Sequence, residues 1–221
     1  MVKSKEWNWK IVDKDDEYWL TPSKELYYLA SDWKSKGFSS FLDMGCGMGR
    51  NSVFMAERGF DVYAFDLSDE SVKRTLENAQ KAGAVLKEVR VADMLFMPYA
   101  DNTFDCLFAM YVVSHTDTAG FKKVVGEIKR VLKVGGEAYF TVLSSDADCL
   151  KNADNQVIDA HTVLLNEDGP EKGVPHFAIG EGDLQKFFGD FEIVEITKTR
   201  QIAGNDTKSP HFHVWIKKAL S

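Results

Sequence analysis

Short apolar runs alternate with longer amphipathic segments along most of the chain. Runs of strand length occupy residues 38–44, 61–66, 87–92, 104–110 and 137–143. The segments at 50–58, 68–82 and 118–132 have the wider apolar spacing of helices. Because βαβ units produce this alternation, the pattern predicts a parallel sheet whose strands are joined by helices.

Two segments, residues 1–40 and 144–180, do not follow this alternation. The first forty residues are rich in aromatic side chains and are predicted to be helical, with one helix face formed by Leu26, Leu29, Ala30 and Trp33. Residues 144–180 include Pro170 and Pro175 and break the alternation. We expect this segment to be a partly ordered insertion over the sheet edge that serves as a lid or substrate segment.

The end of the chain predicts a short helix at 182–188, strands at 191–199 and 211–218, and a loop at 203–209 between them. Two strands joined without a crossover helix must be antiparallel. The fold class is therefore α/β, a doubly wound, Rossmann-like, seven-stranded and mostly parallel sheet with an antiparallel last strand. We expect one domain over 1–221, which comprises a helical lid (1–37), a core (38–143), the insertion (144–180) and a C-terminal helix with antiparallel strands (181–221).

Composition narrows the range of partners. Hydrophobic residues make up 44% of the 221 residues, enough for a real core, and the net charge is −7 with a pI near 5.3. An acidic chain is a poor partner for a phosphate backbone or an anionic membrane, so we expect neither nucleic acid nor membrane as a partner. Three cysteines without CxxC spacing argue against a disulfide framework and fit a reducing cytoplasm.

The chain shows no targeting or membrane-spanning signal. Its basic N-terminus is not followed by the apolar run of a signal peptide. The longest apolar stretch, residues 106–113, is far shorter than the ~20 residues that cross a bilayer. We therefore expect a cytoplasmic protein.

The sequence FLDMGCGMGRN at 41–51 joins the first strand to the first helix of the core. Gly45 and Gly47 fit the first two glycines of a dinucleotide-binding loop, but the third position holds Arg50. The strand ends in Asp43, an acid that would repel a pyrophosphate and attract an α-amino group. Because the N–H groups of the loop can receive a carboxylate, this arrangement favours a zwitterion such as methionine.

The next strands also end in chemically useful residues. Asp66, at the end of the second strand, is placed to hold the two hydroxyls of a ribose. Asp93, after the third strand, can accept a hydrogen bond from an adenine amino group, and Met94 can pack on the ring. The fourth strand ends in residues that would wall the pocket, Ala109, Met110 and Tyr111.

These motifs resemble the class I S-adenosylmethionine-dependent methyltransferases. FLDMGCGMGRN is similar to their first motif, Asp66 to the acid of the second, and VADM and FDCLFAMYVVSH to the third and fourth. IKRVLKVGGEAYF resembles the segment that closes the core. The resemblance is close over residues 38–143, and residues 181–218 match the family only in the order of their predicted elements. Within the family, the sequence is similar to the subgroup of tellurite-resistance-type and other small-molecule methyltransferases.

The resemblance implies S-adenosylmethionine as the cofactor and a set of residues that hold it. Around the methionine part it implies Asp43, Gly45, Cys46 and Gly47, with Arg50 and Asn51 at the carboxylate. Around the ribose and adenine it implies Asp66, Leu67, Ala92, Asp93 and Met94, with Ala109 and Met110 as pocket wall. Two departures from the family are Val134 in place of a proline, which affects only a turn, and Met110 in place of a polar residue.

Two histidines are candidates for catalysis. His115 follows the fourth strand where the methyl acceptor should lie, and His176 lies in GVPHF; each could orient or deprotonate a nucleophile. The pair His211 and His213 shares one strand face, but without a third ligand we assign it a structural role and predict no metal site. Tyr18 and Trp19 could fold over the cofactor.

The predicted reaction is direct in-line transfer of a methyl group to a small-molecule nucleophile, by a monomer or homodimer. Such catalysis depends on positioning and desolvation, so no strong base is required. Alternatives are methylation of a protein or other macromolecule and non-catalytic binding of S-adenosylmethionine. A nicotinamide oxidoreductase is disfavoured by Asp43 and Arg50.

Overall fold

The computed structural model describes residues 2–199, 202–203, 206–207 and 210–219. Its helices are α1 (Glu17–Leu20), α2 (Glu25–Ser35), α3 (Arg50–Glu57), α4 (Asp69–Ala82), α5 (Thr118–Val131) and α6 (Leu184–Phe188). The strands of the main sheet are β1 (Ser40–Met44), β2 (Asp61–Asp66), β3 (Glu88–Val91), β4 (Phe104–Ala109), β5 (Leu132–Ser144), β6 (Gln156–Asp159), β7 (Thr162–Leu164), β8 (Pro175–Ile179), β9 (Glu192–Thr199) and β12 (His211–Lys217).

Seven of these strands form the predicted sheet, in the order β3-β2-β1-β4-β5-β12-β9. Neighbours from β3 to β5 are parallel, and β12 is antiparallel to both β5 and β9. The α/β class, the mostly parallel sheet and the antiparallel last strand are therefore confirmed. Because β1 lies between β2 and β4, the chain reverses direction across the sheet at this point, and the carboxyl ends of these strands form a crevice.

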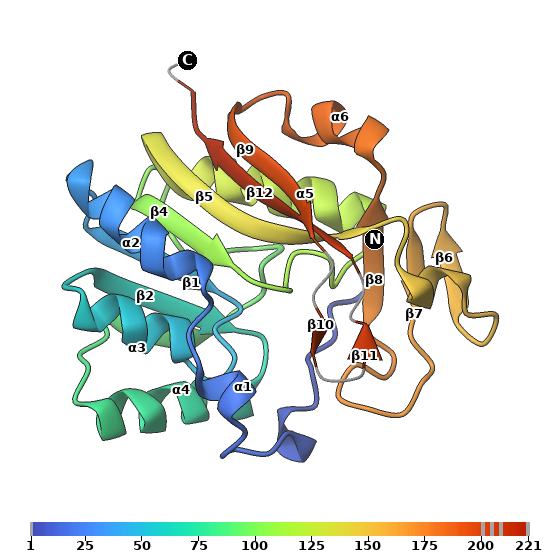
Figure 1. Ribbon diagram of the computed structural model, residues 1–221, viewed down its shortest axis with the longest axis horizontal. Coiled ribbons are helices and arrows are strands. Elements are labelled where there is room, and N and C mark those ends of the chain that lie inside the picture. Colours follow the sequence, from blue (N-terminus) through green and yellow to red (C-terminus); the bar gives the residue numbers. More distant parts are fainter. Residues whose placement is uncertain (1, 200–201, 204–205, 208–209, 220–221) are drawn as a thin grey trace.

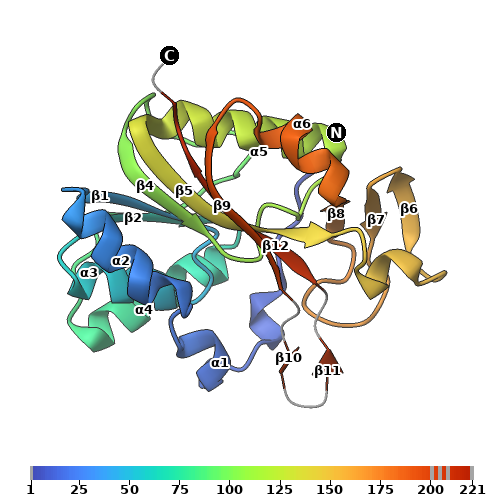
Figure 2. The same cartoon turned by 45° about the horizontal axis from the view of Figure 1, so that its top comes forward.

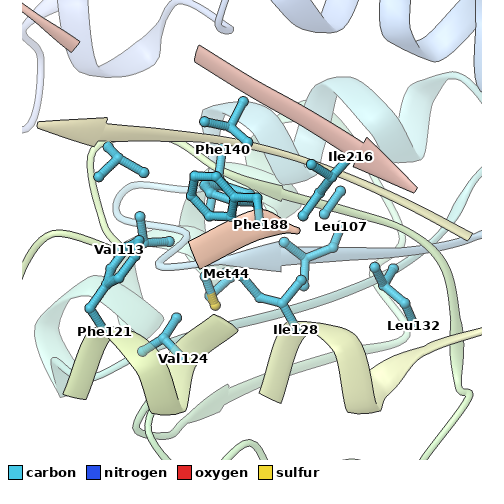
Figure 3. Close-up of a cluster of buried hydrophobic side chains, with 14 of the residues drawn as sticks. Met44, Leu107, Val113, Phe121, Val124, Ile128, Leu132, Phe140, Phe188 and Ile216 are labelled. Carbon is cyan, nitrogen blue, oxygen red and sulfur yellow. The ribbon is translucent and has the colours of Figure 1, made fainter. Parts of the chain in front are cut away.

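Helices cover both faces of the sheet: α2, α3 and α4 lie on one side, and α5 and α6 on the other (Figure 1). The predicted apolar face of α2 is buried, including Trp33 at 0% exposure. On the opposite face, Phe121 and Ile128 of α5 pack against Phe140 of β5 and Phe188 of α6 (Figure 3). The two cores hold the strand ends, and hence the crevice, in a fixed arrangement.

The connection between α5 and β5 differs from the prediction. We expected a glycine turn at residues 135–136 before a strand at 137–143, but β5 begins at Leu132, directly after the helix. Gly135 has a φ of +77°, so it bends the strand without ending it. The backbone hydrogen bonds from Gly135 N–H to Lys218 O and from Lys218 N–H to Gly136 O continue the ladder to the end of β12.

Residues 144–180 also differ from the prediction of a partly ordered insertion. They contain β6, β7 and β8, and β8 pairs in parallel with the end of β5, so the segment extends the sheet in the order β5-β8-β7-β6 (Figure 2). Residues 175–179 are all buried because they lie beside the core. The alternation of apolar and polar residues did not reveal these strands because β6 and β7 are short.

The expected loop at 203–209 lies partly outside the described residues. Ile202–Ala203 (β10) and Asp206–Thr207 (β11) form a short antiparallel pair. In the part of the chain that the structure describes, no helix is long and apolar enough to cross a membrane.

Candidate active site

The loop from β1 to α3 runs close against the neighbouring strand. The N–H groups of Gly45 and Cys46 both donate to the carbonyl of Phe65 in β2, at 2.8 and 3.0 Å. Gly45 has a φ of +72°, and a Cβ there would lie 2.4 Å from a methyl group of Val112. Only glycine fits this position, and the backbone therefore lines the crevice directly.

Asp66, at the end of β2, connects the glycine loop to the start of α4. Its carboxylate accepts hydrogen bonds from the N–H groups of Gly47 and Ser68, both at 3.0 Å. Burial raises the pKa of Asp66, and these two hydrogen bonds partly offset that effect. A carboxylate offers about four acceptor sites, so Asp66 retains capacity for further donors on its cavity side.

Asp43 is more deeply buried, at 1% exposure, and accepts a 2.5 Å hydrogen bond from the hydroxyl of Ser52 in α3. Burial raises its pKa to about 6, against the lowering effects of Ser52 and of the Arg50 guanidinium. The structure thus places Asp43 beneath the glycine loop, where it ties β1 to α3. Its role toward a cofactor amino group stays a prediction.

A cavity opens at the carboxyl ends of β1, β2 and β4, and the empty space in it, including the part that is open to solvent, is about 890 Å³. The structure brings eleven of the predicted cofactor residues into its wall, namely Gly45, Cys46, Gly47, Arg50, Asn51, Asp66, Leu67, Ala92, Asp93, Met94 and Met110. Asp43 lies beneath the loop, and Ala109 packs in the hydrophobic core between the sheet and α5.

Individual contacts refine these assignments. Asp93 accepts a hydrogen bond from Leu95 N–H at 2.8 Å, so one carboxylate oxygen caps the next turn while the side chain also borders the cavity. Burial raises the pKa of the Cys46 thiol well above its ordinary value, which keeps it protonated. Cys46 therefore borders the cavity as a protonated thiol and is not suited to act as a nucleophile.

Arg50 and Asn51, predicted to contact a carboxylate, also anchor the N-terminal segment. The guanidinium of Arg50 donates to the carbonyls of Tyr18 and Thr21, at 2.5 and 3.1 Å. The side-chain oxygen of Asn51 accepts from Ser23 N–H at 2.9 Å. The first turn of α3 thus holds in place the segment that closes one side of the cavity.

That segment carries an aromatic cluster over the glycine loop. The rings of Trp7, Trp9 and Trp19 lie with their centroids 5.2 to 5.3 Å apart, and all three line the cavity. A Cβ on Gly47 would lie 3.0 Å from Trp9. Trp19 was predicted as a lid residue, whereas the ring of Tyr18 lies against the Arg50 guanidinium. Trp7 and Trp9 were missed because nothing in their spacing indicates where the segment folds back.

The two candidate catalytic histidines lie side by side, with ring centroids 5.0 Å apart. His115 lines the cavity and stacks on Trp7. Burial lowers the pKa of His115 to about 3, and the charge of His176 adds to this effect. Its ring is therefore neutral near pH 7, and it is better suited to offer a lone pair than to hold a proton. A catalytic role for either histidine stays a prediction.

Glu171 lies beside these histidines, and no pattern in the sequence indicates it. Its carboxylate lies 3.8 Å from the ring of His115 and 3.5 Å from that of His176. Burial acts to raise the pKa of Glu171, but the two facing imidazoles outweigh it and leave that pKa lowered. His213, by contrast, has the structural role we expected: its Nδ1 lies 3.0 Å from the hydroxyl of Tyr139.

Comparison with known proteins identifies the relatives of this chain. Residues 42–140 match the model of a methyltransferase domain. A sterol 24-C-methyltransferase of Schizosaccharomyces pombe is 33% identical over 139 residues, which cover 61% of this chain and 36% of that protein. A sarcosine/dimethylglycine N-methyltransferase of Aphanothece halophytica is 34% identical over 103 residues, or 45% of this chain and 36% of that protein.

The chain thus matches only about a third of the length of these two curated relatives. Among solved structures, an S-adenosylmethionine-dependent methyltransferase from Methanosarcina mazei superposes with a TM-score of 0.70 at 20% identity. That superposition covers 83% of this chain and 94% of the other. At this identity the likeness concerns the fold.

Proposed function

We propose that this chain binds S-adenosylmethionine in the cavity and transfers its methyl group to a small-molecule nucleophile, because residues 42–140 match the model of a methyltransferase domain. The observation that carries the proposal is the lining of the cavity, which is formed by the glycine loop and by the residues that end the second and third strands. This lining provides backbone N–H groups for the methionine part of the cofactor, a carboxylate for its ribose and apolar side chains for its adenine.

The ribose and adenine fit at Asp66 and Asp93. The carboxylate of Asp66 faces the cavity while two N–H groups hold it in position, so it is oriented to accept from the two ribose hydroxyls. Met94 and Leu67 supply apolar surface for the adenine. This arrangement also accounts for the burial of an acid at only 9% exposure, since a bound ribose would supply the remaining donors.

The methionine part fits at the glycine loop. The amino acid carboxylate can lie near the Arg50 guanidinium and the N-terminus of α3, where the helix dipole is positive. Asp43, buried beneath the loop, contributes negative charge on the side of the α-amino group. The sulfonium would then face the part of the cavity bounded by His115 and Trp7.

The transfer is a single displacement. The acceptor's lone pair attacks the methyl carbon, the carbon–sulfur bond breaks with its electron pair on sulfur, and S-adenosylhomocysteine leaves. Trp7, Trp9 and Trp19 line the cavity, and their apolar rings would displace water from the reacting groups when both substrates are bound. Positioning and desolvation of this kind supply most of the rate enhancement.

A small acceptor is supported by the substrate names of the sterol and sarcosine relatives and by the aromatic walls that narrow the cavity. The protein is to be incubated with methyl-tritiated S-adenosylmethionine and panels of phenols, thiols, amines and sterols, and separately with a protein extract. We expect label in a small-molecule fraction, with S-adenosylhomocysteine in equal amount.

Label found in the protein fraction alone would replace the small-molecule acceptor by a macromolecular one. Binding of S-adenosylmethionine without transfer to any acceptor in these panels would instead contradict the proposed transfer. The Asp66→Asn variant serves as the control, because it lacks the carboxylate on which cofactor binding depends.

A further inference from the structure

Three donor side chains from two distant segments of the chain meet beside the cavity, and one of them, His115, forms part of its wall. His115 lies in the loop after β4, Glu171 in the loop before β8, and His176 within β8. The Nε2 atoms of the two histidines lie 3.8 and 3.5 Å from the same carboxylate oxygen, Oε1 of Glu171. One ligand atom from each of the three residues lies within 4.8 Å of the others.

Backbone hydrogen bonds hold these segments together. Phe177 N–H, next to His176, donates to the carbonyl of Ser114, next to His115, at 2.8 Å. Val174 N–H donates to the carbonyl of Glu171, also at 2.8 Å, and so closes a turn between Glu171 and His176. The cluster is therefore built by the fold and does not depend on flexible surface side chains meeting by chance.

The ring of His176 is oriented by its other nitrogen. Nδ1 lies 3.1 Å from the carbonyl of Val174, and because a carbonyl only accepts, Nδ1 carries the proton. In the neutral ring, Nε2 then has a lone pair directed at Glu171. A histidine that ligates a metal through one nitrogen commonly donates from the other to a backbone carbonyl in this way.

We propose that His115, His176 and Glu171 bind one divalent transition-metal ion of the Zn²⁺ type. Two imidazoles and one carboxylate form the donor set of catalytic zinc sites, which keep a further coordination position open. The distances from Glu171 Oε1 to the two Nε2 atoms, 3.5 and 3.8 Å, are longer than those of good hydrogen bonds. The three atoms therefore surround a space into which each can direct a lone pair. Ligands at about 2.1 Å from zinc stand roughly 3.4 Å apart, so a bound ion would draw the cluster slightly inward.

The site opens toward the reacting groups because His115 lines the cavity and stacks on Trp7. A role of the metal site in methyl transfer rests on the proposed function. Such a role would specify that the methyl acceptor carries an O–H or S–H group. Bound to the metal, that group would lose its proton to solvent at lower pH than when free. The resulting oxygen or sulfur anion would attack the methyl carbon, and the electron pair of the carbon–sulfur bond would leave on S-adenosylhomocysteine.

The test is a titration of the chelator-treated protein with Co²⁺, in which binding is followed by the visible absorption of low-coordinate Co²⁺ and by competition with Zn²⁺. We expect one equivalent to bind and Zn²⁺ to displace it. Glu171→Gln and His115→Gln should weaken binding on the order of 10- to 100-fold. His161→Gln, a histidine outside the cluster between β6 and β7, should bind as the unaltered protein does.

Either of two results would overturn the metal site: no stoichiometric binding of Co²⁺, or equal binding by the unaltered protein and Glu171→Gln. In either case the cluster is an ion pair between histidine and glutamate. The Glu171 side chain is 36% exposed and glutamine has its shape, so this variant should keep the fold, which circular dichroism would verify. Calorimetry with S-adenosylmethionine on the same samples separates a failed metal site from a failed cofactor site.

Discussion

Replacing Asp66 by asparagine should lower the affinity for S-adenosylmethionine by about 30-fold or more, which corresponds to about 2 kcal/mol. The carboxylate is buried at the cavity wall, and a hydrogen bond to a charged acceptor contributes about 1.5 to 3 kcal/mol. Asparagine has one acceptor oxygen, and its amide group would face one of the N–H donors that Asp66 now satisfies. Calorimetric titration of the variant measures the loss.

The matched control is Asp61→Asn. Asp61 begins the same strand, β2, at the end away from the cavity, and its carboxylate pairs with the exposed Lys87 at 3.2 Å. This variant should bind S-adenosylmethionine as tightly as the unaltered protein. If Asp66→Asn also kept full affinity while remaining folded, the ribose assignment would be wrong.

A second large effect is expected from Gly45→Ala. The new methyl group would lie 2.4 Å from Val112, at a backbone φ of +72°. Left-handed backbone costs about 1 to 2 kcal/mol for a residue with a side chain, and overpacking costs a further 1 to 3 kcal/mol. We expect the free energy of unfolding to fall by about 2 to 5 kcal/mol and the affinity for S-adenosylmethionine to fall as the loop is displaced.

The Gly83→Ala variant separates the cost of the left-handed backbone from the cost of overpacking. Gly83 ends α4 with a φ of +68°, but a Cβ there would meet nothing within 4 Å. Urea denaturation of both variants should show a loss of about 1 to 2 kcal/mol for Gly83→Ala and a larger loss for Gly45→Ala. Equal losses would show that the contact between the glycine loop and Val112 is loose, contrary to the described packing.

The cofactor half of the cavity could be predicted from the sequence because its determinants are local. The glycine loop needs backbone conformations that only glycine adopts readily, and Asp66 and Asp93 lie at the carboxyl ends of two successive predicted strands. Because the carboxyl ends of parallel strands meet at one edge of the sheet, the positions of these residues at strand ends also indicated that they line the same cavity. Ala109 was less predictable because β4 is buried on both faces, so its sequence has no apolar–polar alternation that indicates where each side chain points.

The acceptor half could not be predicted in the same way because it is assembled by long-range contacts. Glu171 lies in a polar stretch that gives no periodic signal, and it reaches His115 only because β8 joins the sheet beside β5. The N-terminal segment crosses the glycine loop because Arg50 and Asn51 bind its backbone. Side chains of α3 that were assigned to a ligand therefore also serve to close the site.

The most direct test of the central claim, that this cavity is a site for S-adenosylmethionine, is calorimetric titration of the purified protein with S-adenosylmethionine, S-adenosylhomocysteine and NAD. The account predicts micromolar binding of the first two compounds, one molecule per chain, and no heat from NAD. Binding of NAD alone would mean that the glycine loop holds a pyrophosphate despite Asp43 and Arg50. Binding of none of the three would contradict the assignment of the cavity.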